Sequence, residues 1–179
     1  MSITTRDGDG GETGLMFGRR LRKDEPRVHA SGTVDELNSV LGVARACLGD
    51  DSSEVVQAVA AVQQDLVSLM GQLNTLPDDW ERYCSAGYGV LGEDRIAWMD
   101  ERIAAIEAEL PPPKHWSMPG AAGHVGAAHL EVARTVCRRA ERWVLGLENI
   151  AGAPEQFSGG VYLNRLSDFL WLLARKLES

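Results

Sequence analysis

The sequence predicts an all-α protein: a five-helix, up-and-down bundle preceded by an irregular, glycine-rich loop. Three observations lead to this prediction. Apolar residues recur at three- and four-residue spacing along five long stretches, as they do on the buried face of a helix. Glycine and proline interrupt the chain between those stretches, which gives short connections. No stretch offers a convincing strand. We therefore expect one domain over residues 1–179, divided into a loop at 1–26 and a bundle at 27–179.

The first two helices are defined by their apolar stripes and by proline. The first runs from Pro26 to about Leu48, and the second from Ser53, its expected N-cap, to about Leu76. Pro77 ends the second helix. The apolar positions expected in the core are Val34, Leu37, Leu41 and Ala44, then Val55, Val59, Val62, Leu66, Leu69 and Leu73.

Three further helices complete the bundle. Residues 77–92 mix aromatic residues with glycine and are expected to form a loop. A triple proline ends the third helix, and a Pro/Gly loop at 114–123 leads into the fourth. The bounds expected are about Glu93 to Leu110 for the third helix, an end near Leu147 for the fourth, and about Gln156 to Leu177 for the fifth. Inward positions of the third helix are Ile96, Met99, Ile103 and Ile106.

Composition limits the classes of function. The chain is 44% hydrophobic and 25% charged, which suits a soluble protein with a sizeable core. Its net charge of −8 argues against a nucleic-acid partner, because such binding usually needs a basic face. No apolar run reaches membrane-spanning length, and the first residues lack a signal-peptide pattern. The cysteines are odd in number and have no metal-ligand spacing, which favours a reduced, cytoplasmic setting: Cys47, Cys84 and Cys137.

A cluster of arginines stands out in this acidic chain. Between Arg134 and Arg142 the fourth helix carries four arginines and one glutamate, without glycine or proline. At about 3.6 residues per turn, Arg134, Arg138, Glu141 and Arg142 fall near one face, with Arg139 beside them. Charge runs usually cover a solvated helix surface, which is the alternative interpretation. However, any anion bound by a chain of this net charge needs such a local basic site.

The N-terminal loop carries a second pattern that suits anions. The stretch from Asp7 to Gly14 has four glycines in eight positions, and the backbone N–H groups of such a run can face a phosphate. It lacks the strand and the Gly-Lys-Ser/Thr ending of a Walker loop, and a flexible terminus is the alternative. The basic residues Arg19, Arg20, Arg22 and Lys23 follow it. Its carboxylates would repel phosphate, although they could face a divalent cation bound to phosphate: Asp7, Asp9 and Glu12.

Several other positions have both a structural and a functional interpretation. Asp35 lies off the apolar stripe of its helix, either as a helix-start carboxylate or as the partner of an arginine. Trp116 could plug the end of the core or give a flat wall for a planar ligand. Asn164 and Ser167 lie on a largely apolar helix, so they need a partner in the protein or in a ligand. The histidines near 115–129 lack a completing carboxylate, so we expect no metal site there.

Six stretches of sequence now fall in a recognisable order: Thr5 to Thr13, Lys23 to Val28, Gly32 to Ser39, Met118 to Gly120, Ala133 to Arg142, and Tyr162 to Asp168. In this order and spacing they resemble the trimeric PduO-type ATP:corrinoid adenosyltransferases. The resemblance covers nearly the whole chain and is poorest over residues 77–92. Its central and final motifs are the most specific.

The resemblance implies a fold, an assembly and a reaction. The fold would be a five-helix bundle that forms a homotrimer, with active sites between subunits. The reaction would transfer the 5′-deoxyadenosyl group of ATP to the cobalt of cob(I)alamin, which forms adenosylcobalamin and releases triphosphate. Mg²⁺ would accompany ATP. A reductase and an adenosylcobalamin-dependent enzyme are possible further partners.

The resemblance also implies roles for individual residues. The N-terminal loop would order around ATP, and Lys23 would reach the phosphates. Arg138 and Asn164 would serve catalysis. Asp35 would pair with Arg134 across the subunit interface and support the corrin, and Trp116 would lie on the corrinoid side. The full ATP-binding set would be Thr5, Arg6, Asp7, Gly8, Thr13, Gly14, Lys23, Arg138, Arg139, Glu141, Arg142 and Asn164, with ordinary helix surface as the alternative for Arg139.

Some positions depart from the family pattern. Asp7 stands where the family usually has Thr or Asn, beside the phosphates. The family's Leu-Pro-Gly-Gly begins here at Met118, the segment from there to Arg134 is slightly longer than usual, and Glu131 replaces a histidine. Trp116 replaces a phenylalanine that helps to expel the lower axial ligand of cobalamin. A trimer that holds ATP or adenosylcobalamin for delivery or sensing, without efficient catalysis, is therefore the alternative function.

Overall fold

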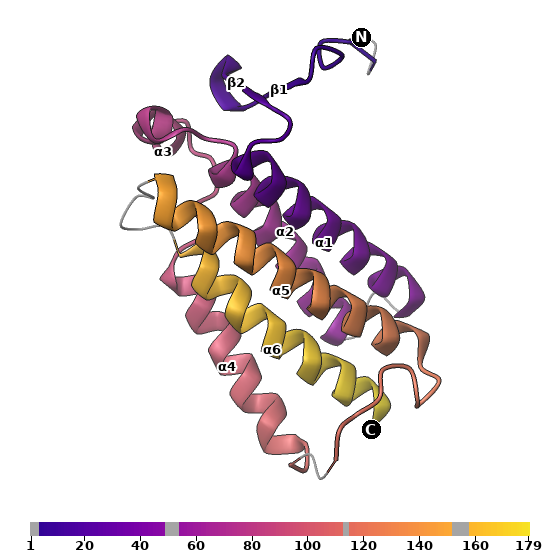
Figure 1. The fold of residues 1–179 in the computed structure, drawn as a ribbon. Coiled ribbons are helices and arrows are strands. Elements are labelled where there is room, and N and C mark those ends of the chain that lie inside the picture. The colour runs from indigo at the N-terminus through magenta and orange to yellow at the C-terminus, as the bar shows by residue number, and fades with distance from the viewer. Residues whose placement is uncertain (1–3, 49–53, 113–114, 152–157) are drawn as a thin grey trace.

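The computed structural model describes residues 4–48, 54–112, 115–151 and 158–179. Within these ranges long α-helices form a bundle, and a short two-stranded hairpin lies near the N-terminus (Figure 1). The elements in chain order are β1 (Glu12–Gly14), η1 (Met16–Gly18), β2 (Arg20–Arg22), α1 (Pro26–Leu48), α2 (Glu54–Leu73), η2 (Pro77–Asp79), α3 (Trp80–Ser85), α4 (Glu93–Glu109), α5 (Val125–Ala151) and α6 (Gly159–Glu178).

The apolar stripes of α1 and α2 lie in the core, as their spacing predicts. Val34 and Leu37 in α1 and Leu66 in α2 are fully buried, while the neighbouring Asp35 is exposed. In α4 only Met99 and Ile106 of the expected stripe are buried, and the other two positions are half-buried. This helix packs mainly on α6 and so lies at the margin of the core.

The order of the helices decides which faces remain available for a site. Helix α1 packs against α2 and α5, α5 against α6, and α6 against α4. Figure 1 shows α5 between α1 and α6, with the β1–β2 hairpin and α3 at one end of the bundle. The segment before α5 and the C-terminus of α6 lie at the other end. Of the motif-bearing helices, α5 is therefore the direct neighbour of both α1 and α6.

Two expectations about the irregular segments are wrong. Residues 77–92 are not only a loop, because they contain η2 and α3, so the structure describes six α-helices where five were expected. Tyr83 is buried and stacks on Trp80 and Tyr88, with ring centroids 5.5 Å and 5.1 Å apart. Its hydroxyl donates to the carbonyl oxygen of Gly89 at 2.8 Å. A small aromatic core thus orders a segment too short to show helical periodicity.

The N-terminal segment is also more regular than expected. Strands β1 and β2 pair in antiparallel register, with Thr13 opposite Leu21. Three-residue strands are too short for alternation to reveal them in a sequence. The expected N-cap at Ser53 and the expected helix start at Gln156 lie outside the described residues, and α6 begins at Gly159.

No helix within the described ranges combines the length and the apolar character needed to cross a bilayer.

Candidate functional site

The arginine cluster lies on the outward face of α5. Val136, Cys137 and Ala140 point into the core and are buried, which leaves Arg138 and Arg142 exposed on the other side of the helix. Arg142 Nη1 donates to the backbone oxygen of Arg138 at 2.8 Å, so the two guanidinium groups follow one line along the helix. This face is polar and positively charged in a chain of net charge −8.

Helix α6 contributes to the same face through Asn164. Its side-chain Nδ2 donates to Glu141 Oε1 on α5 at 3.1 Å. Ser167 is buried, and its hydroxyl donates to the backbone oxygen of Asn164 at 2.9 Å. The partner expected for Ser167 is therefore structural, whereas Asn164 is exposed and keeps hydrogen-bonding capacity for a ligand. The structure brings Arg138, Glu141, Arg142 and Asn164 together on one face of the bundle.

Arg139 makes an ion pair with a neighbouring helix. Its Nη2 donates to Glu36 Oε2 on α1, and both side chains are about half exposed. Close by, the His29 ring of α1 stacks on Trp143 of α5, with ring centroids 4.9 Å apart. The cluster is thus braced against α1 on one side and against α6 on the other.

Arg134 is held by a carboxylate of its own chain. Its Nε lies 2.7 Å from Glu131 Oε2, and the other oxygen of this carboxylate accepts a hydrogen bond from Arg175 Nη2 at 2.9 Å. Glu131 is only 3% exposed. The expected partner of Arg134, Asp35 of another subunit, cannot be present in a single chain, so that pairing stays a prediction.

The N-terminal hairpin gathers the second set of expected residues. The Lys23 backbone N–H donates to the Gly11 oxygen at 2.8 Å, and Arg20 Nη2 donates to the Asp7 backbone oxygen at 2.8 Å. A Cβ placed on Gly8 would lie 2.9 Å from Lys23 Nζ, so the ammonium group lies directly against the glycine run. Arg6 adopts a left-handed backbone, with φ 65°. Strained backbone of this kind concentrates at ligand-binding positions.

A cavity of about 340 Å³ joins the hairpin to α1. Thr13 and Gly14 line it from β1, and Asp35, Ser31 and Gly32 line it from α1. Residues expected on the nucleotide side and on the corrinoid side therefore share one cavity wall. The remaining lining residues are Val28, Met70 and Asn74.

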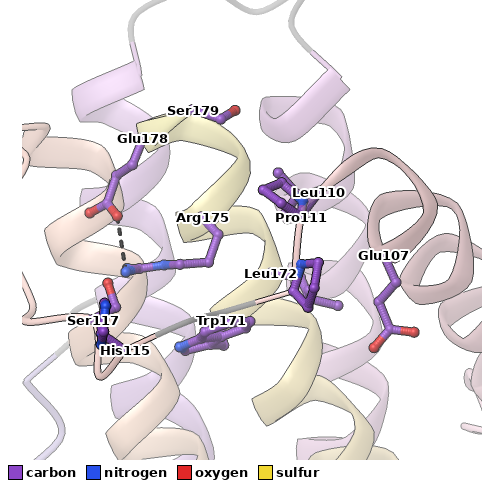
Figure 2. A pocket seen from close by; sticks show the side chains of 11 residues that line it. Glu107, Leu110, Pro111, His115, Ser117, Trp171, Leu172, Arg175, Glu178 and Ser179 are labelled. Atoms are coloured by element: carbon purple, nitrogen blue, oxygen red, sulfur yellow. Dashed lines mark ion pairs between the residues drawn. The ribbon is translucent and has the colours of Figure 1, made fainter.

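The segment with Trp116 lies at the other end of the bundle. The indole is 85% exposed, so the interpretation of Trp116 as a plug of the core is wrong. Its neighbours His115 and Ser117 line a cavity of about 590 Å³, together with Trp171 and Arg175 of α6 (Figure 2). Arg175 Nη1 also lies 3.0 Å from Glu178 Oε2, an ion pair that Figure 2 marks with a dashed line. The tryptophan itself is free to contact a planar ligand or another subunit.

The described residues offer no cluster of side chains that could hold a metal ion by themselves. In the described part of the chain, no three His, Cys, Asp or Glu side chains are grouped as a protein-held metal requires. His124 instead accepts a hydrogen bond at Nδ1 from the Ala127 N–H, 3.1 Å away, at the start of α5. A cation could still bind through one or two carboxylates and a phosphate ligand, as Mg²⁺ often does.

Several important partners were not predicted. Glu131 precedes Arg134 by three residues, and that spacing is a usual one for helical ion pairs, so the signal was present in the sequence. Glu36 and Arg175 come from other helices, and no local pattern links them to the cluster.

The chain is similar in sequence and in fold to known proteins. A family model described as cobalamin adenosyltransferase matches residues 3–177. A cobalamin adenosyltransferase of Cupriavidus metallidurans is 40% identical over 179 residues, which cover 98% of this chain and 88% of that protein. A corrinoid adenosyltransferase of Bacillus subtilis is 36% identical over 183 residues, covering 100% of this chain and 88% of the relative.

A solved structure shows that the likeness extends to the fold. It is a single-substitution variant of the PduO-type ATP:corrinoid adenosyltransferase from Lactobacillus reuteri, complexed with cobalamin and ATP. Its TM-score to this chain is 0.87 at 32% identity, over 99% of this chain and 93% of that one. With a family model matched over nearly its full length, the chain belongs to the cobalamin adenosyltransferase family.

Proposed function

We propose that this chain transfers the 5′-deoxyadenosyl group of ATP to the cobalt of cob(I)alamin, forming adenosylcobalamin and releasing triphosphate. The family match over residues 3–177 carries this proposal. The relative from Lactobacillus reuteri, which is complexed with both cobalamin and ATP, supports the choice of substrates.

The chemistry explains why the polar face is rich in arginine and lacks a protein nucleophile. The electron pair of cobalt(I) forms the bond to C5′ of ATP while the C5′–O bond breaks, and the electrons of that bond leave with the triphosphate. The protein has to bring C5′ close to cobalt and to stabilise charge on the leaving group. Guanidinium and ammonium groups do this well because they donate charge-assisted hydrogen bonds to phosphate oxygens.

On the nucleotide side, the hairpin and the face of α5 that carries Arg138 and Arg142 would contact different parts of ATP. Lys23 and the glycine run would hold the phosphates, with Thr5, Arg6, Asp7, Gly8, Thr13 and Gly14 around the rest of ATP. Arg138 and Arg142 would neutralise the leaving triphosphate. The hydrogen bond between Glu141 and Asn164 would fix both side chains for contact with the nucleotide. Arg139 would contribute less to phosphate binding, because it is already paired with Glu36.

On the corrinoid side, we place Asp35, Arg134 and Trp116. The exposed indole suits a flat contact with the corrin macrocycle. Asp35 would approach Arg134 of a neighbouring subunit in a homotrimer. Arg134 has room for a second acceptor, because Glu131 occupies its Nε and a guanidinium carries five N–H donors.

Mg²⁺ would enter as part of the nucleotide substrate. Asp7 and Asp9 are exposed beside the glycine run, and carboxylates of this kind fit a cation already bound to phosphate. The wider setting is also proposed: one domain over the chain, in the cytoplasm, with a reductase that supplies cobalt(I) and an adenosylcobalamin-dependent enzyme that takes the product.

The experiment is an anaerobic assay with cob(I)alamin, Mg-ATP and a strong reductant, followed by the spectrum of the corrinoid. Wild type should form adenosylcobalamin. Arg138→Ala should lower kcat by about a hundredfold or more, because it removes a donor to the leaving group. Arg102→Ala is the matched control, since Arg102 is an exposed arginine on α4 that stacks on Trp98.

Two outcomes would count against these assignments. Tight binding of ATP by wild type without any corrinoid change would favour delivery or sensing over catalysis. Equal activity of the Arg138 and Arg102 variants would remove Arg138 from the mechanism.

A further inference from the structure

Two polar contacts hold the β1–β2 hairpin, one with Asp79 in the segment 77–92 and one with Asn74 just after α2. Arg19 Nε lies 2.6 Å from Asp79 Oδ2, and Arg19 Nη2 lies 3.1 Å from Asp79 Oδ1. The guanidinium therefore forms a bidentate ion pair with the carboxylate. The Met16 N–H donates to the backbone oxygen of Asn74 at 2.9 Å. Asp79 is buried at the start of α3, which makes it a fixed point for the hairpin.

Phe17 adds an apolar contact at the same place. Its backbone is left-handed, with φ 58°, which a bulky residue adopts only when its surroundings enforce it. The surroundings here are residues around α3. The Arg82 guanidinium lies 4.3 Å from the centre of the Phe17 ring, and the Tyr88 ring meets it edge-on at 6.3 Å. The turn of the hairpin is therefore shaped by its contact with residues 77–92.

The same hairpin carries the residues assigned to ATP. Thr13 and Gly14 lie in β1, and β2 leads directly to Lys23, whose N–H donates to the Gly11 oxygen. Arg19 immediately precedes β2, so its side chain is only four positions from Lys23. Successive side chains of an extended segment alternate in direction, which agrees with Arg19 bonding Asp79 while Arg20 bonds Glu12.

We propose that Asp79 is a positioning residue for ATP. Paired with Arg19, it holds the end of the hairpin against α3, so that the loop expected to order around ATP starts from a fixed base. Preorganisation of this kind strengthens binding because less conformational entropy is lost on association. Asp79 touches neither substrate. The inference rests on the proposed assignment of the hairpin to ATP, and it gives residues 77–92, the poorest part of the family resemblance, a specific task.

The test compares Asp79→Asn and Arg19→Gln with wild type, by calorimetric titration with Mg-ATP and by steady-state adenosylation. Each variant should raise the Kd and the KM for ATP by about tenfold, while kcat and the KM for the corrinoid change less than about twofold. A purely structural role would change all four constants together. The charge-swapped double variant, Arg19→Asp with Asp79→Arg, should recover most of the ATP affinity.

Asp100→Asn is the matched control. It removes an aspartate from another Arg–Asp pair, with Arg165 at 2.8 Å, which joins α4 to α6 away from the hairpin. Its affinity for ATP should equal that of wild type. The proposal is overturned if Asp79→Asn and Arg19→Gln bind Mg-ATP as wild type does, or if wild type does not bind Mg-ATP. If wild type binds Mg-ATP but does not adenosylate the corrinoid, the proposed function is contradicted. The titration then still tests whether the Arg19–Asp79 pair positions the hairpin for ATP.

Discussion

At the scale of single residues, Glu131 is the least expected feature of the polar face. It is almost fully buried and pairs with two arginines, Arg134 of α5 and Arg175 of α6. In the family motif that the sequence resembles, this position is a histidine. A carboxylate between two guanidinium groups compensates buried positive charge, which neutral histidine could not do. The change from the family pattern therefore comes with a compensating ion-pair network.

Glu131→Gln tests this network. The amide keeps the shape of the side chain but removes its charge, so two arginines lose a shared buried partner. We expect the free energy of unfolding to fall by about 3 kcal/mol, measured by urea denaturation. Glu109→Gln is the control, because Glu109 is exposed and pairs with Lys176 at 3.2 Å, so it should cost less than about 1 kcal/mol. Similar losses in both variants would mean that Glu131 is no more important than a surface carboxylate.

Cys137 shows how burial limits a reactive group inside the motif. It lies between the arginines in sequence but faces the core, and its thiol donates to the Leu163 oxygen at 3.2 Å. Desolvation raises its pKa far above the usual value, so no thiolate forms near neutral pH. This agrees with a reaction whose nucleophile is the cobalt of the substrate.

At the scale of elements, the sequence predicts the helices well and the hairpin poorly. The buried stripe of α1 follows from spacing alone, because a helix face repeats every three to four residues. The hydrogen bond between Glu141 and Asn164 becomes evident only once the structure makes α5 and α6 neighbours. The pair of Arg19 with Asp79 does not follow, since its members are 60 positions apart and no periodicity links them. The sequence leaves the burial of Trp116 open, because a loop residue belongs to no periodic apolar pattern that would show which way its side chain points.

The Arg19–Asp79 pair, which holds the hairpin, should respond to pH in a defined direction. A hydrogen bond from Arg19 lowers the pKa of the Asp79 carboxyl below its usual value, and Asp79 raises the pKa of Arg19. The pKa of Asp79 is lower in the folded protein than in the unfolded chain. Its contribution to the stability of the docked hairpin is therefore complete above the pKa of the unfolded state, and it is lost as pH falls through the pKa of the folded state. The contribution of Arg19 is lost only far above neutrality.

Amide hydrogen exchange of Met16 measures how firmly the hairpin is docked, because the Met16 N–H donates to the backbone oxygen of Asn74. After correction for the intrinsic exchange rate, protection should stay level from about pH 5 to 9 and decline below about pH 4. Asp79→Asn should give low protection at every pH. A decline centred near pH 6.5 would point to a histidine and against the Arg19–Asp79 pair.

At the scale of the whole molecule, the motif-bearing helices α1, α5 and α6 also expose apolar side chains. On α5, Val132 is 48% exposed, Leu145 40% and Trp143 38%. Val43 of α1 and Val161 of α6 are also exposed. Large apolar side chains left on the outside of a bundle suit an interface between subunits. They support the proposed homotrimer, in which α5 of one subunit would meet the hairpin of another.

A shared active site can be tested by mixing two inactive proteins. Lys23→Ala damages the hairpin side, and Arg138→Ala damages the α5 side. If each site takes its hairpin from one subunit and its arginine face from the next, some sites in mixed trimers combine two intact sides. With random assembly from equal amounts, half of the hairpins and half of the arginine faces are intact, so about a quarter of the sites should be active.

The measurement is adenosylation by the co-expressed mixture, compared with the two variants purified separately and then assayed together without exchange. The mixture should reach about a quarter of the wild-type rate, and the unexchanged pair should stay inactive. A site formed within one chain would give no recovery in either sample, because no single chain in the mixture carries both intact sides. Recovery therefore distinguishes a site built between subunits from one that merely lies near an interface.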